Sequence, residues 1–200
     1  MCIRDRDILL ASANGMVICF NENDVRVMGR DAAGVRGMML DAGDYVVGAG
    51  IAAKAKQLLS VTEYGYGKRT EIEAYLRLGE DGQRRPQNRG GKGIMAMRLT
   101  DKTGLMAAQL LVSEDEDIML ITDDGTIIRM PVSDISVIGR VSQGVRVMRV
   151  EEGSRIVCVT ATERDEDEQD ESEDGQTEAD SLDMDVGGEN SETQPEETDE

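Results

Sequence analysis

Short apolar runs, each broken by a glycine turn, recur along the chain up to residue 162. Residues 8–11 and 118–121 are apolar runs of the length of a buried strand, and Asn14-Gly15 and Asp124-Gly125 follow them. These dipeptides favour a two-residue type I′ hairpin turn, in which both central residues need a positive φ. We therefore predict a strand before and after each turn. No stretch shows a sustained helical period, so the pattern predicts an all-β protein. The further strands expected lie at 16–20, 35–40, 45–47, 126–130, 145–150 and 155–159.

The pattern repeats at a fixed offset. Residues 7–48 and 117–158 align without a gap at an offset of 110, and 15 of the 42 aligned positions are identical, Gly34/Gly144 among them. A third copy begins near Gln57 and is longer, with its extra residues around LRLGEDGQRRPQ, where we predict a loop insertion. Four short strands per repeat, with glycine turns between them, are typical of a propeller-like blade.

Three such blades cannot close a disc, so we expect an open arc with unpaired strand edges at its ends. The expected segments are an unassigned leader (1–6), a blade (7–50), a blade with a loop insertion (51–112), a blade (113–162) and an acidic tail (163–200).

Charge separates the last segment from the rest. The 200 residues carry a net charge of −19, yet residues 1–162 hold 21 Lys and Arg against 22 Asp and Glu. Residues 163–200 hold one Arg against 19 Asp and Glu. A segment of this composition cannot bury enough apolar surface to offset chain entropy, so we expect the tail to be disordered.

Several function classes lack their usual residues. The chain has no histidine and no CxxC pair, and it shows no nucleophile motif, so we predict no catalytic residue and no metal site. Cys19 and Cys158 lie in apolar runs and are expected in the core. Neither a signal peptide nor a membrane-spanning apolar run is present, which favours a cytoplasmic protein without membrane contact.

Most candidate binding residues lie in a basic loop that recurs in each repeat, at 29–34, 88–93 and 139–144, and further cations of the middle repeat add to them. An arginine stands four residues before the last glycine each time, and the middle loop reads Asn-Arg-Gly-Gly-Lys-Gly. Glycine N–H groups and nearby cations suit phosphate oxygens, and a row of such loops would suit a bent duplex. Nothing resembles an element that reads base edges. One Gly-rich basic loop alone is more typical of a solvated turn, and the recurrence of the arginine favours binding. The candidate contacts are Arg30, Lys68, Arg69, Arg84, Arg85, Arg89, Gly90, Gly91, Lys92, Gly93 and Arg140.

The segments DILLASANG, EYGYGKRTEIEAY, RGGKGI and DIMLITDDGTIIRMPVSDISVIGRVSQGVRV stand in the order in which the C-terminal domain of the DNA gyrase A protein has them. Over roughly residues 7–162 the chain resembles that family. The resemblance implies a β-pinwheel, a propeller-like disc whose blades exchange strands and whose basic rim wraps double-stranded DNA. The chain departs from the family because it holds three blades, whereas about six are usual. The family's box, Gln-Arg-Arg-Gly-Gly-Lys-Gly, is split here by Pro-Gln-Asn and lies in a later blade.

The resemblance also implies an activity of the holoenzyme: an ATP-dependent type IIA topoisomerase, an isomerase that introduces negative supercoils. The gyrase B protein would complete an A2B2 heterotetramer and would use ATP and Mg²⁺, with no cofactor in this chain. Independently of the resemblance, the charge of the acidic tail leads us to expect that it competes with DNA for the basic rim. Two alternatives stay open: the corresponding domain of topoisomerase IV, which decatenates DNA, and a protein-binding propeller without nucleic-acid function.

Overall fold

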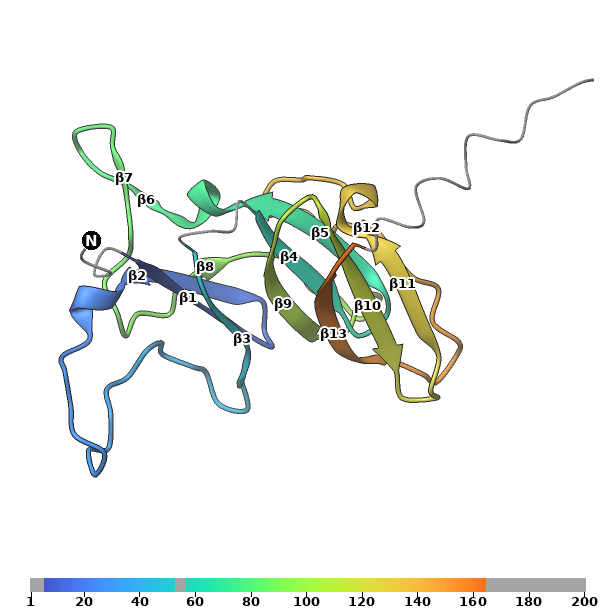
Figure 1. Cartoon of the computed structure of the whole chain (residues 1–200), viewed down its shortest axis with the longest axis horizontal. Helices are drawn as coiled ribbons and strands as arrows, with labels where there is room; N and C mark the ends of the chain where they lie inside the picture. The colour runs from blue at the N-terminus through green and yellow to red at the C-terminus, as the bar shows by residue number, and fades with distance from the viewer. Residues whose placement is uncertain (1–5, 53–56, 165–200) are drawn as a thin grey trace, which may run out of the picture. The chain divides into compact units, whose positions relative to one another are not determined.

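A computed structural model describes residues 6–52 and 57–164, and within these residues the chain is built from antiparallel β-sheets without an α-helix (Figure 1). The predicted acidic tail lies outside the described residues except for Glu163 and Arg164. Three larger sheets correspond to the three repeats, as expected for three blades. The first sheet has the strand order β3 (Val46–Ile51), β1 (Asp7–Ser12), β2 (Met16–Asn21) and β8 (Ile94–Met95). The second sheet has the strand order β12 (Val145–Arg146), β5 (Tyr66–Glu71), β4 (Gln57–Thr62) and β9 (Met106–Val112).

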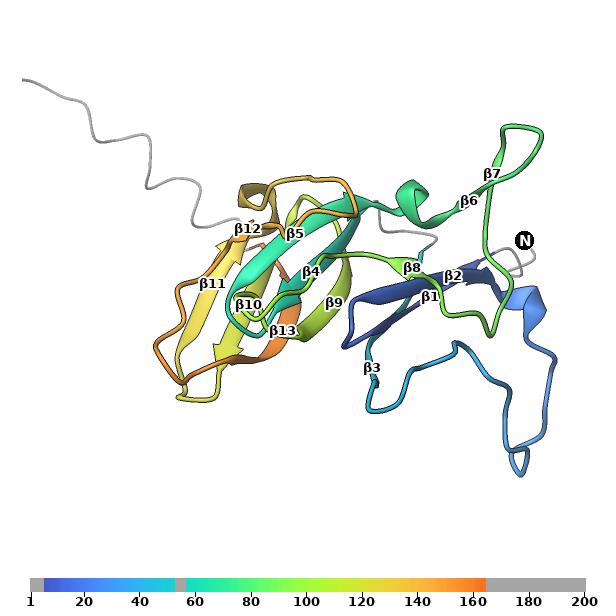
Figure 2. The same cartoon turned by 180° about the vertical axis from the view of Figure 1, so that it is seen from behind.

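The third sheet has three strands, and within the described residues no short fourth strand pairs with β11 as β8 and β12 pair with the other two sheets. Its order is β11 (Ile127–Pro131), β10 (Glu116–Thr122) and β13 (Ile156–Glu163). Because β13 runs to Glu163, the sheet extends one residue into the segment expected to be tail. The strands β3 and β13 both contact β9, so the three sheets adjoin through this set of strands, as Figure 2 also shows from behind.

The first two sheets are completed by strands from the following repeat. The short strand β8 pairs with β2, and β12 pairs with β5, each in antiparallel register. The blades are therefore not continuous chain segments, and the expected boundaries at 50 and 112 describe the sequence repeats but not the sheets. Residues 35–40, expected as a strand, form none in the structure. Their counterparts in the later repeats pair with a preceding sheet, and the described residues hold no sheet before β1.

The hairpin turns differ from the predicted type I′. In each repeat the glycine N–H bonds to the carbonyl three residues earlier, from Gly15 to Ser12, from Gly65 to Thr62 and from Gly125 to Thr122. The glycine therefore follows the two central residues, with a φ between 77° and 90°. This is a three-residue loop with a left-handed glycine at its end, the second common hairpin connection. The prediction of a glycine-dependent hairpin is confirmed, and the prediction of its type is wrong.

Apolar side chains fill the spaces between neighbouring sheets. One cluster joins the first and second sheets through Leu9, Val17 and Leu58, and another joins the second and third through residues such as Leu59 and Ile118. Burial of this kind is the main stabilising contribution to such repeats.

The two cysteines differ from one another. Cys19 is buried as predicted, and burial raises the pKa of its thiol to about 12. Cys158 is exposed, so that prediction is wrong. It lies on β13, an edge strand of the third sheet, where an apolar run does not require burial.

Connecting segments complete the described chain. Three short 3-10 helices follow the second strands of the three repeats: η1 (Glu22–Asp24), η2 (Ile72–Tyr75) and η3 (Val132–Asp134). The insertion of the middle repeat forms a small hairpin of β6 (Arg77–Leu78) and β7 (Arg84–Arg85), which extends from the first sheet in Figure 1. No helix of the described residues is long and apolar enough to cross a membrane.

Candidate nucleic-acid interface

The three recurring loops have the same backbone conformation at their ends. Gly34, Gly93 and Gly144 have φ values of 81°, 79° and 75°. A side chain is excluded from the two later positions for a further reason. A Cβ on Gly93 would lie 2.3 Å from the carbonyl oxygen of Val17 in β2, and one on Gly144 would lie 2.6 Å from that of Gly67 in β5. This glycine therefore lets the exchanged strand reach the preceding sheet, and the predicted phosphate contact at Gly93 is not supported by its position.

The recurring arginine joins one repeat to the one before it. The guanidinium of Arg89 donates to the carbonyl oxygens of Arg36 and of Asp24, the latter at 3.1 Å. Arg140 donates to the carbonyl oxygen of Met95 at 3.4 Å, and Met95 is the position equivalent to Arg36 one repeat later. Arg89 and Arg140 are half-buried. These two side chains therefore contact the preceding repeat, and their binding to phosphate stays a prediction.

Arg30, the third member of this set, is exposed and forms no hydrogen bond or ion pair with a described residue. Its equivalents act on a preceding repeat, and no preceding repeat lies within the described residues.

Lys68 and Arg69 are buried, so they do not form a basic surface as predicted. The Lys68 ammonium is fully buried and donates to the carbonyl oxygens of Gly139, at 2.8 Å, and of Arg140, and to the Ser142 hydroxyl at 3.2 Å. Burial, with the charge of Arg140 as a smaller cause, lowers the pKa of Lys68 to about 8. A side chain with these partners cannot reach a phosphate of a docked duplex.

Arg69 acts on the same neighbouring repeat. Its guanidinium donates to the carbonyl oxygens of Ile135, at 2.6 Å, and Ser133, at 3.1 Å. The equivalent residue in the first repeat is the apolar Cys19. The two consecutive cationic side chains Lys68 and Arg69 on β5 therefore bind the 133–142 segment. Because charged residues are usually exposed, their charge alone does not reveal that they are buried.

The predicted cations of the insertion are accessible. Arg84 and Arg85 lie exposed on β7, where Arg84 donates to the carbonyl oxygen of Glu73 at 2.7 Å and Arg85 pairs with Asp81. Lys92 is about half exposed and lies 2.6 Å from Asp41. Exposed ion pairs of this kind are weak, so these cations can bind another anion in place of the acidic side chain.

The middle loop lines an open hollow of about 470 Å³. The Gly90 backbone has a φ of 84° with no neighbour closer than 3.7 Å to a Cβ position, and Gly91 is exposed. Arg77, which the sequence did not single out, adds a third cation beside Arg89 and Lys92. The hollow thus keeps the glycine-rich cationic character that the loop sequence predicts.

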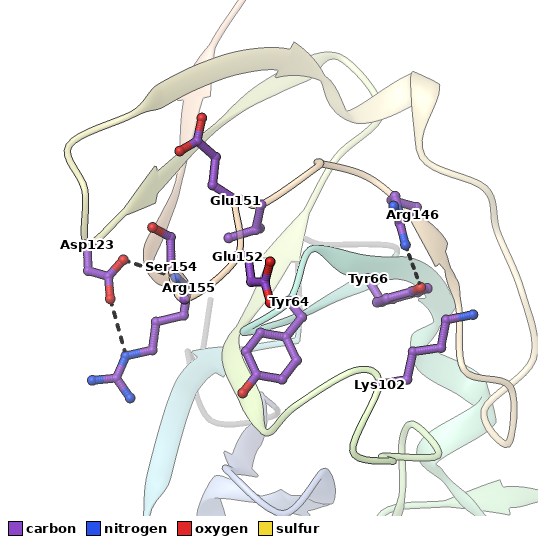
Figure 3. Close-up of a pocket in the computed structure, with 11 residues that line it drawn as sticks. Tyr64, Tyr66, Lys102, Asp123, Arg146, Glu151, Glu152, Ser154 and Arg155 are labelled. Carbon is purple, nitrogen blue, oxygen red and sulfur yellow. Dashed lines mark hydrogen bonds and ion pairs between the residues drawn. The ribbon is translucent and has the colours of Figure 1, made fainter.

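A second hollow of about 490 Å³ contains a group of residues that the sequence prediction missed (Figure 3). Arg146 of β12 donates to the Tyr66 hydroxyl at 3.0 Å, and its guanidinium lies 5.4 Å from the ring centre. The ammonium of Lys102 lies 5.6 Å from the same ring. The hydrogen bond from Arg146 and the two positive charges lower the pKa of Tyr66. Acidic residues, among them Glu151 and Glu152, line the other end.

Six arginines are exposed and form no side-chain hydrogen bond or ion pair within residues 6–52 and 57–164. Three lie just after the left-handed glycine of their repeat, Arg36 in the first, Arg98 in the second and Arg149 in the third. The sequence repeat contains this signal, because Arg98 and Arg149 stand at the same distance from their glycines. The complete set is Arg26, Arg30, Arg36, Arg77, Arg98 and Arg149.

Comparison with known proteins gives one family. The chain matches the family model described as DNA gyrase C-terminal domain, beta-propeller, over residues 6–53, 56–83, 85–108 and 116–162. The DNA gyrase A protein of Staphylococcus epidermidis strain ATCC 12228 is 40% identical over 165 residues, which are 82% of this chain and 18% of that protein. The corresponding protein of Ureaplasma parvum serovar 3 is 37% identical over 153 residues, which are 76% and 17%. The chain thus spans less than a fifth of these curated relatives.

Solved structures agree with this match. A structure of the DNA gyrase A C-terminal domain has a TM-score of 0.69 and 27% identity, covering 80% of this chain and 52% of that one. A crystal structure of the C-terminal domain of DNA topoisomerase IV has a TM-score of 0.71 and 25% identity, covering 80% and 47%. The repeated sheets with exchanged strands, the matched residues and the identity to gyrase A proteins place this chain in the DNA gyrase C-terminal domain family.

Proposed function

We propose that this chain binds the backbone of double-stranded DNA and bends it, as the DNA-wrapping part of a DNA gyrase A protein. The observation that carries the proposal is the set of six exposed arginines that have no acidic partner among the described residues, on a body whose total charge is nearly balanced. Exposed cations without acidic partners are available to a polyanion such as duplex DNA, which binds them with release of counterions.

The arrangement favours backbone contact over sequence reading. No α-helix of the described residues is available for the major groove, and the hollow at residues 88–93 is lined by Arg77, Arg89 and Lys92, whose charges suit phosphate oxygens. Arg98 and Arg149 stand at equivalent positions of the second and third repeats, and Arg36 stands closer to the left-handed glycine of the first. A duplex held at successive repeats must follow their curvature, and bending costs several kcal/mol that summed phosphate contacts offset.

The remaining parts of the proposal concern the longer protein in which domains of this family occur. Within it, the gyrase B protein would supply ATP and Mg²⁺ chemistry in an A2B2 assembly in the cytoplasm, and the outcome would be negative supercoiling. Gyrase is preferred over topoisomerase IV because the curated relatives at 40% identity are gyrase A proteins.

Replacing Arg36, Arg98 and Arg149 together by glutamine tests the proposal. Each lost phosphate contact lowers the slope of log K against log salt by about 0.9, so we expect the slope for a linear duplex to fall by about 2.7. A matched triple variant at Arg6, Arg155 and Arg164 removes the same charge from side chains that already pair with acids. Equal slopes for the two variants would contradict the proposed track. Absence of salt-dependent DNA binding by the unmodified chain would favour a protein-binding propeller.

A further inference from the structure

The hollow drawn in Figure 3 lies between the second and third repeats and contains none of the six exposed arginines to which DNA binding is assigned. Its lining comes from the β4–β5 hairpin turn, the loop before β9, the segment at β12, and the start of β13 with the turn before it. The hairpin turn at residues 63–65 forms backbone hydrogen bonds of 2.8–3.1 Å to Val147, Ile156 and Thr103, one in each of the other segments. The hollow is therefore preformed, and its volume of about 490 Å³ suits a small molecule.

Hydrogen-bond donors converge at one end of this hollow, around Tyr66. Arg146 donates to the Tyr66 hydroxyl at 3.0 Å, so the hydroxyl can donate its own proton to a further acceptor. A guanidinium has five N–H donors, and within the described residues Arg146 uses only the one that bonds to Tyr66. The Lys102 ammonium lies 5.6 Å from the Tyr66 ring centre and forms no ion pair with a described residue. A hydroxyl, a guanidinium and an ammonium together match the several acceptor oxygens of one phosphate group.

The rest of the lining adds an aromatic ring and hydrogen-bond acceptors. Tyr64 is 45% exposed, so its ring offers a surface on which a flat group can stack. The carboxylates of Glu151 and Glu152 are exposed and bind no described residue, whereas Arg155 is paired with Asp123 at 3.6 Å. Two such carboxylates repel a polyanion such as duplex DNA. They accept hydrogen bonds from the exocyclic amino group of a base, in the way that acidic side chains accept from cytosine.

We propose that this hollow is a binding site for a nucleoside phosphate whose base carries an exocyclic amino group. The phosphate binds Tyr66, Arg146 and Lys102, and the base stacks on Tyr64. The amino group donates to a carboxylate at the acidic end of the hollow. A free nucleotide and an unpaired nucleotide of a DNA strand offer the same groups, so the chemistry of the site admits both.

A nucleotide fits this lining better than simpler anions do. Inorganic phosphate or a carboxylic acid would use the donors around Tyr66 but would leave the Tyr64 ring and the two carboxylates without a partner. The first repeat serves as an internal comparison, because Asn14 and Met16 stand where the second repeat has Tyr64 and Tyr66. The site is therefore a property of one junction and not of the repeat as such.

Calorimetric titration of the 200-residue chain with adenosine 5′-monophosphate tests the site without duplex DNA, so the result is independent of the proposed DNA wrapping. This nucleotide should bind at least about tenfold more tightly than adenosine or ribose 5-phosphate, because each of these lacks part of the contacts. A single-stranded oligodeoxyadenylate distinguishes the two sources: tighter binding than the mononucleotide identifies a DNA strand, and weaker binding identifies a free nucleotide. Binding of neither overturns the proposal, as does equal affinity for the mononucleotide and ribose 5-phosphate.

Two tyrosine variants locate the phosphate and the base. Tyr66→Phe keeps the ring and removes the donor, so it should weaken mononucleotide binding about tenfold and leave adenosine binding unchanged. Tyr64→Ala should weaken the binding of both at least about fivefold, through loss of stacking. Tyr45→Phe is the matched control, since Tyr45 is 53% exposed and lies outside the hollow. Equal effects of Tyr66→Phe and Tyr45→Phe on mononucleotide binding would contradict the assignment, and thermal unfolding checks that each variant is folded.

Discussion

Replacing Lys68 by methionine should measure how strongly one buried cation holds two repeats together. The ammonium donates to three oxygens of the 139–142 segment, and each hydrogen bond of a charged group contributes about 1.5 kcal/mol or more. Relief of the cost of burying the ammonium offsets part of this sum. We expect a net loss of about 2–3 kcal/mol in the free energy of unfolding.

Urea unfolding followed by far-ultraviolet circular dichroism, under reducing conditions, gives this difference. Lys92→Met is the control, because Lys92 is 52% exposed and should change stability by less than about 0.5 kcal/mol. The equivalent position in the first repeat is apolar (Ile18), so Lys68→Ile should also fold. A loss below about 0.5 kcal/mol for Lys68→Met would show that the three bonds contribute nothing net.

The dependence on pH provides a separate check with a defined sign. Burial lowers the pKa of Lys68 from 10.5 to about 8 in the folded chain. Between these values the unfolded chain binds more protons than the folded chain, so the unmodified protein should gain stability relative to Lys68→Met as pH rises. Below pH 8 the difference between the two proteins should be constant. A difference that moves in the opposite direction with rising pH in this window would contradict the assignment.

Further predictions concern glycine, cysteine and tyrosine positions. Gly93→Ala should lower the free energy of unfolding by about 3 kcal/mol, because of left-handed strain and a collision with the Val17 carbonyl. Gly82→Ala, whose surroundings are open, should lower it by about 1 kcal/mol. Thermal unfolding of the two variants makes the comparison. Cys158 should react with a thiol reagent in the folded chain, whereas Cys19 should react only on unfolding, as peptide mapping would show. The Tyr66 hydroxyl should titrate below its ordinary pKa in an ultraviolet titration, and removing Arg146 should reduce that shift, while Lys102 keeps part of it.

The sequence predicted well what depends on local pattern. Apolar runs beside Asn-Gly and Asp-Gly located β1, β2, β10 and β11, and the repeat located three sheets. It could not locate β8 and β12 within the sheets, because a two-residue strand has too little pattern to reveal its partner.

The candidate site was predicted less well, for a related reason. Charge alone placed Lys68 and Arg69 on a surface, although both are satisfied by carbonyl oxygens of a segment about 70 positions further along the chain. Such partners leave no local trace in the sequence. The exposed Arg98 and Arg149, by contrast, follow a recurring glycine at one fixed distance, and attention to that spacing alone would have found them.

Strand exchange also bears on how the chain is made. The first sheet receives its fourth strand only after residue 95 has left the ribosome, and the second only after residue 146. During synthesis, β2 and β5 therefore each wait with an open edge while the intervening residues are translated. The first sheet is therefore completed before the second, and each is completed only when the following repeat has been synthesised. A translational pause within residues 96–144 would leave the edge of β5 unpaired for longer, and an unpaired strand edge is prone to aggregation.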